Sequence, residues 1–149
     1  MSAERKVLIL SKIAVIYWSG TGNTEAMAKA VAQGARGKGA SAELLTPDAV
    51  SPSMLSAFTG VALGCPAMGA ETLEEDEFEP MFQSVKSALA GKKVALFGSY
   101  GWGGGEWMRT WEQDCAAAGI SLACESVICN EAPEDDAIEA CKALGAALA

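Results

Sequence analysis

The sequence predicts an α/β protein in which a parallel sheet of five strands is sandwiched between two layers of helices. Two uniformly apolar runs, 61–65 and 94–98, are typical of strands that are buried on both faces. Such short runs alternate with stretches of helical apolar spacing, and right-handed crossovers between parallel strands leave few other architectures. The 149 residues suffice for one domain with a single core.

The first two strand–helix units are predicted from an apolar run, from an alanine-rich stretch after it, and from two prolines that separate the next two elements. Residues 13–18 form the apolar run and lead into a loop rich in hydroxyl groups and glycine. Residues 25–36 predict a helix, because apolar residues recur there at helical spacing and glycines mark its end. A short strand at 42–45 and a short helix around 54–58 are expected next, with prolines between them.

The remaining units follow the two buried strands. After 61–65, the acidic stretch 74–79 enters a helix whose apolar residues recur at helical intervals. After 94–98 come a glycine-rich loop and a helix with a stripe of two tryptophans and a cysteine. The fifth strand is expected within 121–128, and a last helix begins after Pro133.

The charged residues exclude several classes of partner. The chain has 19 acidic and 11 basic residues and a formal net charge of −8. This balance argues against nucleic acid and anionic membranes and favours basic proteins as partners. Apolar residues make up 50% of the chain, which excludes a disordered protein. No membrane span is expected, since no apolar run approaches about 18 residues.

The cysteines and the missing histidine narrow the chemistry further. The five cysteines contain no CxxC pair, so no zinc site, dithiol motif or iron–sulfur cluster is predicted, and they are expected to be small buried residues of a cytoplasmic protein. The absence of histidine removes a histidine-based triad, metal site or proton shuttle. Residues 1–11 carry Arg5, Lys6 and a short apolar run, and we interpret them as a non-targeting extension of a domain at 12–149.

Residues 19–24 form a candidate phosphate-binding loop after the first strand. Its hydroxyl groups, carboxamide and two glycines can surround an anion with neutral N–H and O–H donors, aided by the positive end of the following helix. The loop contains no lysine or arginine. A polar turn in which a threonine or asparagine caps the helix is the alternative, and the loop alone does not decide between the two.

The loops after the third and fourth strands lie at the same edge of the predicted sheet, where ligands of such folds bind. The first of them offers Met68 and Gly69, and the second offers Tyr100 and Trp102 among glycines. Trp102 has no helical or strand stripe to bury it, whereas Met68 could belong to the core and Trp18 to the core or a pocket wall. A flat aromatic ligand that carries a phosphate would contact all three loops.

Three segments in this order resemble the short-chain flavodoxins of the clostridial type. They are YWSGTGNTE at 17–25, GCPAMGAETLEEDEFEPMF at 64–82 and KKVALFGSYGWGGGEWMR at 92–109. The resemblance implies a flavodoxin-like three-layer sandwich with the strand order 2-1-3-4-5. It also implies one non-covalently bound FMN that carries single electrons at low potential, cycling between semiquinone and hydroquinone.

The resemblance further implies how the cofactor is held. The phosphate would lie in the first loop and the flavin ring between Met68 and Trp102, with backbone groups bonding the polar edge of the ring. In this family a peptide of the third-strand loop flips on one-electron reduction; here it is Gly69–Ala70, and we expect a positive φ at this glycine. The implied cofactor-binding residues are Ser19, Gly20, Thr21, Gly22, Asn23, Thr24, Pro66, Ala67, Met68, Gly69, Ala70, Glu71, Ser99, Tyr100, Gly101, Trp102 and Gly103.

Two departures from the residues common in this family predict a change in redox potential, and four acidic residues predict how partners dock. Ala70 and Gly104 stand where such proteins often carry acids, which predicts a less negative lower couple than in relatives with both acids. A monomeric carrier rather than an enzyme is expected; the alternatives are a flavodoxin-like quinone or azo reductase and an interaction module without flavin. Acids beside the third-strand loop are expected either to steer basic redox partners or to be a solvated helix start; they are Glu71, Glu74, Glu75 and Asp76.

Overall fold

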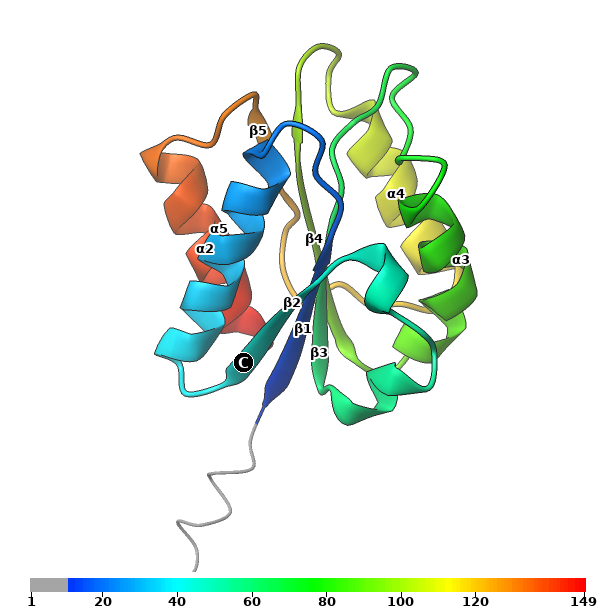
Figure 1. Ribbon diagram of the computed structural model, residues 1–149, viewed down its shortest axis with the longest axis vertical. Helices are drawn as coiled ribbons and strands as arrows, with labels where there is room; N and C mark the ends of the chain where they lie inside the picture. The colour runs from blue at the N-terminus through cyan, green and yellow to red at the C-terminus, as the bar shows by residue number, and fades with distance from the viewer. Residues whose placement is uncertain (1–10) are drawn as a thin grey trace, which may run out of the picture.

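The five strands form one parallel sheet in the order β2-β1-β3-β4-β5 in the computed structural model, which describes residues 11–149 (Figure 1). The strands are β1 (Lys12–Tyr17), β2 (Ser41–Leu45), β3 (Gly60–Gly64), β4 (Lys93–Tyr100) and β5 (Val127–Asn130). The helices are α2 (Asn23–Gly37), α3 (Phe78–Leu89), α4 (Glu106–Ala117) and α5 (Asp135–Leu148). The predicted fold class and strand order are confirmed, and the register brings the carboxyl ends of β1, β3 and β4 to one edge.

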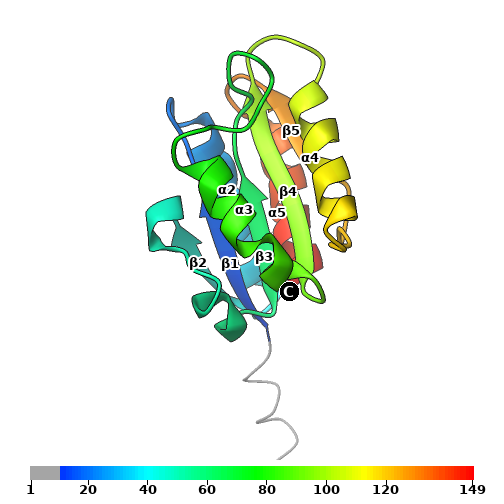
Figure 2. The same ribbon diagram turned by 90° about the vertical axis from the view of Figure 1, so that its right-hand side faces the viewer.

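The two faces of the sheet are covered by different helices and different side chains. Side chains alternate along β1, so that Ile13 and Val15 pack with α2 and α5, whereas Ala14 and Ile16 pack with α3 and α4 (Figures 1 and 2). The α2 and α5 side is filled largely by alanine and small aliphatic residues. The other side combines aliphatic residues with several large aromatic ones, among them Phe78, Phe82, Trp107 and Trp111.

Helices α2 and α5 lie in direct backbone contact through two glycines. A Cβ atom built on Gly145 would lie 1.9 Å from the carbonyl oxygen of Val31, and one built on Gly34 would lie 1.9 Å from that of Lys142. No side chain fits in either position, because real Cβ atoms do not approach other atoms so closely. The small residues of this face therefore set the distance between the two helices.

Several predicted boundaries differ from the structure. The short helix expected around 54–58 consists of one turn of 3-10 helix, η2 (Met54–Ala57), preceded by another, η1 (Pro47–Ala49). The strand expected at 94–98 extends to Tyr100, and the strand expected within 121–128 ends later, at Asn130. Of the predicted extension at 1–11, all but Ser11 lies outside the described residues.

Candidate functional site

The loop between β1 and α2 is organised by the hydroxyl group of Ser19. Its Oγ accepts hydrogen bonds from the backbone N–H groups of Gly22 at 3.1 Å and Glu25 at 3.2 Å. Gly22 precedes the helix with a φ of 98°, a conformation that favours glycine. A threonine or asparagine cap, the alternative for this loop, is wrong, because Gly22 occupies the cap position and no side chain caps the helix from there. Ser19 Oγ instead accepts the N–H of Gly22 and that of Glu25, the third residue of α2. The N–H groups of Asn23 and Thr24, which start α2, have no acceptor within the helix and are available to an anion.

Two hydroxyl groups join this loop to the end of β4. Thr24 is 1% exposed and Ser99 is 4% exposed, and their hydroxyl oxygens lie 3.2 Å apart. A buried pair of hydroxyls in hydrogen-bond contact satisfies both groups without a charge. The start of α2 and the end of β4 are thereby held at a constant spacing.

The loop between β3 and α3 contains a tight turn at Met68. The N–H of Glu71 donates to the carbonyl of Met68 at 2.7 Å, and the N–H of Met68 donates to the carbonyl of Thr72 at 2.9 Å. The predicted positive φ at Gly69 is wrong for this structure: the residue in the left-handed region is Glu71, with a φ of 54°. Gly69 and Ala70 form the exposed centre of the turn, and no atom outside its chain neighbours approaches within 4 Å of a Cβ built on Gly69.

The loop between β4 and α4 carries the most exposed large apolar side chain in the described part of the chain, that of Trp102. Trp102 is 65% exposed, and it is followed by three glycines, of which Gly103 and Gly105 have φ values of 90° and 86°. Ser99 and Tyr100 belong to the end of β4 rather than to this loop. The N–H of Ala67 donates to the carbonyl of Ser99 at 3.0 Å, which fastens the third-strand loop to β4.

All three loops line one cavity of about 260 Å³. It brings together the predicted residues Gly20, Thr21, Asn23, Pro66, Ala67, Met68, Ser99, Tyr100 and Gly101. The other predicted residues belong to the same three segments of the chain but do not line the cavity; they are Ser19, Gly22, Thr24, Gly69, Ala70, Glu71, Trp102 and Gly103. The lining thus combines the neutral polar residues of the first loop with apolar side chains such as Ala67 and Met68.

Two residues of the cavity wall extend the predicted set. Trp18, expected in the core or a pocket wall, lines the cavity and donates from Nε1 to Glu77 Oε1 at 2.8 Å. Glu131, which is not among the residues predicted from the sequence, also lines it and has a φ of 58°. Its N–H donates to the carbonyl of Tyr100 at 2.7 Å. Glu131 directly follows β5, which ends at Asn130 rather than by residue 128 as predicted. A prediction that extended this strand to Asn130 would have placed Glu131 at the same edge of the sheet as the three loops.

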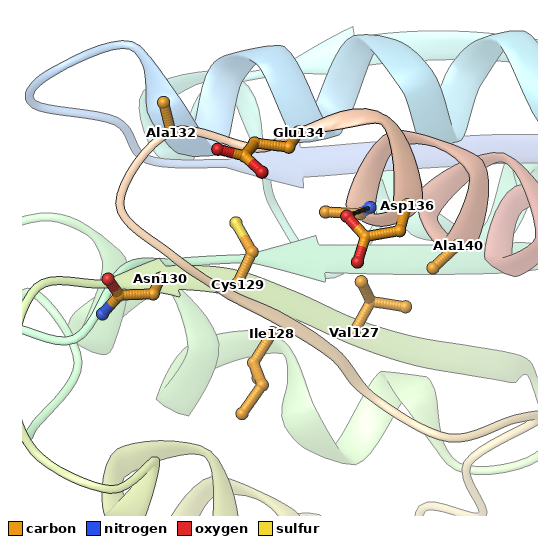
Figure 3. A pocket seen from close by; sticks show the side chains of 9 residues that line it. Val127, Ile128, Cys129, Asn130, Ala132, Glu134, Asp136 and Ala140 are labelled. Carbon is orange, nitrogen blue, oxygen red and sulfur yellow. Dashed lines mark hydrogen bonds between the residues drawn. The ribbon is translucent and has the colours of Figure 1, made fainter.

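A larger cavity of about 480 Å³ lies beside β5 and α5 (Figure 3). Figure 3 shows the carboxyl groups of Glu134 and Asp136 and the sulfur of Cys129 among the side chains that surround it. None of the three predicted loops contributes to the lining of this larger cavity, which comes from β5, the segment after it and the start of α5. The smaller cavity at the loops is therefore the better candidate for an anionic cofactor.

Glu74 differs from the role predicted for it. Its side chain is 5% exposed, and its carboxylate accepts backbone N–H groups of Asp76 at 2.9 Å and of Glu77 and Phe78 at 2.8 Å. Burial alone would raise the pKa of Glu74, but the three N–H donors together hold this pKa below its ordinary value. Glu74 therefore stabilises the start of α3 and does not face partners, whereas Glu75 and Asp76 are exposed.

The described part of the chain was also compared with what a metal site, a membrane span or a reactive thiol requires. Within 11–149, no group of three or more histidine, cysteine, aspartate or glutamate side chains could hold a metal ion. No helix in that part of the chain is long and apolar enough to cross a membrane. Burial raises the pKa of Cys65 to about 12, so this thiol beside the third-strand loop stays protonated at neutral pH.

An open α/β sheet with a cleft among the loops at its carboxyl edge is the architecture of proteins that bind phosphorylated cofactors. A family model described as flavodoxin matches residues 15–145, and the chain belongs to the flavodoxin family. The flavodoxin of Megasphaera elsdenii is 44% identical over 137 residues, which cover 92% of this chain and 98% of the relative. The flavodoxin of Clostridium beijerinckii is 43% identical over 128 residues, which cover 84% and 93%.

A solved structure agrees with the sequence relatives. The solution structure of two-electron reduced Megasphaera elsdenii flavodoxin has a TM-score of 0.84 and covers 91% of this chain and 97% of its own. The protein is therefore an FMN-binding electron carrier rather than an enzyme, as the sequence predicts. These relatives are flavodoxins, so the alternatives of a quinone or azo reductase and of a module without flavin are not favoured.

Proposed function

We propose that FMN binds in the cleft formed by the three loops, and that the protein carries single electrons at low potential between basic redox proteins. The observation that carries this proposal is the cavity lined by residues of all three loops. The lining fits the cofactor: the β1–α2 loop contributes neutral N–H and O–H groups, Met68, Ala67 and Tyr100 contribute apolar surface, and Glu131 is the one acidic residue of the lining. Bound FMN supplies the chemistry of electron transfer.

The phosphate end is assigned to Ser19, Gly20, Thr21, Gly22, Asn23 and Thr24. The free N–H groups at the start of α2 and the loop hydroxyls are donors without charge. Because no lysine or arginine lies in the loop, the phosphate would keep its negative charge close to the flavin. A second electron on the flavin would then meet an anionic surrounding, which lowers the potential at which it is accepted.

The ring end is assigned to Pro66, Ala67, Met68, Gly69, Ala70 and Glu71, and to Ser99, Tyr100, Gly101, Trp102 and Gly103. Met68 is half-buried in the cavity wall, and Trp102 is exposed and follows Gly101, which also lines the cavity. Burial of an exposed indole against a flat ring is favourable both through apolar area and through stacking. We therefore assign Met68 to one face of the ring and Trp102 to the other.

A reductive titration of the FMN-loaded protein tests the low-potential, single-electron function. We expect two resolved steps, each consuming one electron per protein, because the anionic surroundings penalise only the second charge. One step that consumes two electrons would contradict the proposal. The potentials of both steps are read from redox dyes in equilibrium with the protein.

We assign the docking of basic partners to the exposed acids Glu75 and Asp76 and to the surroundings of Glu71. Opposite charges accelerate encounter, and added salt screens them. The double variant Glu75→Gln/Asp76→Gln should weaken the salt dependence of electron transfer to a basic cytochrome, whereas Glu139→Gln on α5 should not. We further propose a monomer in the cytoplasm, where the five unpaired cysteines stay reduced; elution as a dimer in size-exclusion chromatography would contradict the first part.

A further inference from the structure

The outer side of β5 is an open sheet edge that differs from the edge at β2. β5 pairs only with β4, and none of its residues is buried, whereas β2 at the other edge contains the buried Ala42. The N–H of Glu131 donates to the carbonyl of Tyr100 at 2.7 Å, at the end of the ladder between β4 and β5. Backbone groups of successive strand residues point to opposite sides, so those of Ile128 and Asn130 point away from the sheet. They form an unpaired row beside which a further strand fits.

A groove runs along this edge, between β5 and α5. Its two parts are the cavity of about 480 Å³ and a second cavity of about 410 Å³, and Val127, Ile128 and Ala140 line both of them (Figure 3). On the helix side the lining includes alanines at intervals of three residues, Ala137, Ala140 and Ala143. Because these side chains are small, the β5 groove has room for the side chains of an added strand.

The opposite face of this edge is apolar as well. Ile128 is 40% exposed and points away from α5 (Figure 3). It extends toward the start of α4, since its Cδ1 lies 3.3 Å from a Cβ atom built on Gly105. A strand beside β5 would cover Ile128 with one set of alternate side chains and the alanines of α5 with the other.

The charges around the β5 groove favour a basic occupant. Glu134 and Asp136 line one of its two cavities and Glu125 lines the other, and no lysine or arginine is among the described residues of either lining. A second copy of this chain is disfavoured: in an antiparallel pairing centred on Ile128, Glu125 of one copy would lie opposite Glu131 of the other, and the net charge of −8 adds repulsion. A segment with lysine or arginine beside apolar residues is complementary instead.

We propose that the β5 groove is a docking site for an extended segment of a basic protein partner, which adds a strand beside β5 with alternating apolar and basic side chains. The site deepens the proposed function, on which it rests for the nature of the partner. Asn130 lines the groove and the next residue, Glu131, lines the cavity assigned to FMN, so a bound segment would reach the cofactor cavity. The exposed acids Glu75 and Asp76 would attract the partner, and backbone bonds along β5 would fix its orientation.

Titration of the FMN-loaded protein with short peptides, followed by amide chemical shifts in NMR, tests the site. The first probe is a blocked six-residue peptide in which valine and lysine alternate, and in the second glutamate replaces lysine. We expect the lysine peptide to shift the amides of β5 and of residues 137–143 at about 1 mM, since a short segment binds weakly, and the glutamate peptide to leave them unchanged. No shift in β5 at about 5 mM, equal shifts with both peptides, or shifts confined to Glu75 and Asp76 would overturn the proposal.

N-Methylated peptides test whether the segment adds to the sheet. Only every second N–H of an added strand points toward β5. Methylation of that set of residues in the lysine peptide should abolish binding, whereas methylation of the other set should leave the affinity within about threefold. Equal effects of the two methylated peptides would overturn the added strand.

Ala143→Arg and Ala116→Arg are matched variants. Both alanines are exposed and lie in helices, Ala143 in α5 and Ala116 in α4, and only Ala143 lines the β5 groove. Ala143→Arg should weaken binding of the lysine peptide at least about tenfold, because the new side chain fills the groove and repels the lysines, whereas Ala116→Arg should leave the affinity unchanged. Equal affinities of the two variants would contradict the assigned groove.

Dilution of the protein without peptide tests the other occupant. We expect the amide shifts of β5 to stay constant as the protein concentration falls; shifts that change would mean that a second copy occupies the groove, which overturns the proposal. The reductive titration tests the single-electron function without any peptide. Its failure would leave the peptide shifts as an independent result, and loss of peptide binding would leave the assigned cofactor cavity intact, so the two failures are distinguishable.

Discussion

The phosphate end and the ring end of the cleft are held by contacts of different range. At the phosphate end, Ser19 Oγ accepts from Gly22 and Glu25, which lie three and six residues away. At the ring end, the two loops meet through Glu71 and Glu106, which lie 35 residues apart. A contact within six residues leaves a motif in the sequence, whereas a contact between distant loops does not.

The supports behind the two ends differ as well. The helix that leaves the phosphate loop packs against α5 through glycines, with backbone atoms in contact. The helices that leave the ring loops carry aromatic side chains, and Phe78 meets Trp111 edge to face with ring centroids 5.5 Å apart. Close backbone packing tolerates no added atoms, while large side chains can readjust, so the two supports should respond differently to substitution.

The largest effect is expected behind the phosphate end, from Gly145→Val. The new side chain would overlap the carbonyl of Val31 and force α5 away from α2, which should cost about 3 kcal/mol or more of unfolding free energy. Urea denaturation followed by circular dichroism measures this loss. Gly37→Val is the control: Gly37 ends the partner helix α2, a Cβ there has open space, and this replacement should change stability by less than about 1 kcal/mol. Equal losses in both variants would contradict the close-packing account.

Glu74→Ala tests the support of the ring end. Three backbone N–H groups at the start of α3 would lose a charged acceptor, which should cost about 1–3 kcal/mol at pH 7, whereas Glu75→Ala should cost little. Because the pKa of Glu74 is lowered in the folded state, its contribution is complete above its unfolded pKa of about 4.3 and is lost as the pH falls through the folded value. The urea midpoints of the unmodified protein and of Glu74→Ala should therefore converge as the pH is lowered from 7 to 3. A difference between these midpoints that widened on acidification would contradict this role.

The binding of FMN and of riboflavin, which lacks the phosphate, separates the two ends directly. Ser19→Ala should weaken FMN binding about tenfold and leave riboflavin binding unchanged, since the hydroxyl organises only the phosphate loop. Trp102→Ala should weaken both ligands by a similar factor of about ten, since the indole would meet only the ring. Quenching of flavin fluorescence gives both constants. Equal effects of Ser19→Ala on the two flavins would mean that the ends are not independent.

The smallest effect is expected from Ala70→Asp. Ala70 is exposed, and a unit charge at ~10 Å in water changes the energy of an added electron by roughly 0.4 kcal/mol. The lower midpoint potential should therefore become more negative by about 15–20 mV, and Ala70→Asn should leave it nearly unchanged. A lower couple that stayed constant or rose in Ala70→Asp would show that this charge argument is wrong.

By itself the sequence determined the sheet, its coverage on both faces and the three loops of the cleft. Apolar runs and helical spacing are local patterns, and Ser19 to Thr24, Met68 and Trp102 stand in segments whose composition is unusual for ordinary turns. The resemblance of three ordered segments then supplied the strand order and the cofactor. These features follow from residues close together in the chain.

Only the tertiary structure decided which groups face the cleft and which support it. Glu74 and Glu75 are neighbours with the same side chain, yet Glu74 is buried at the start of α3 and Glu75 is exposed. Glu71 rather than Gly69 adopts the left-handed conformation, because bonds to Met68 and to Glu106 hold it there. The physical reason is that burial, strain and capping between loops depend on distances across the fold, which sequence spacing does not contain.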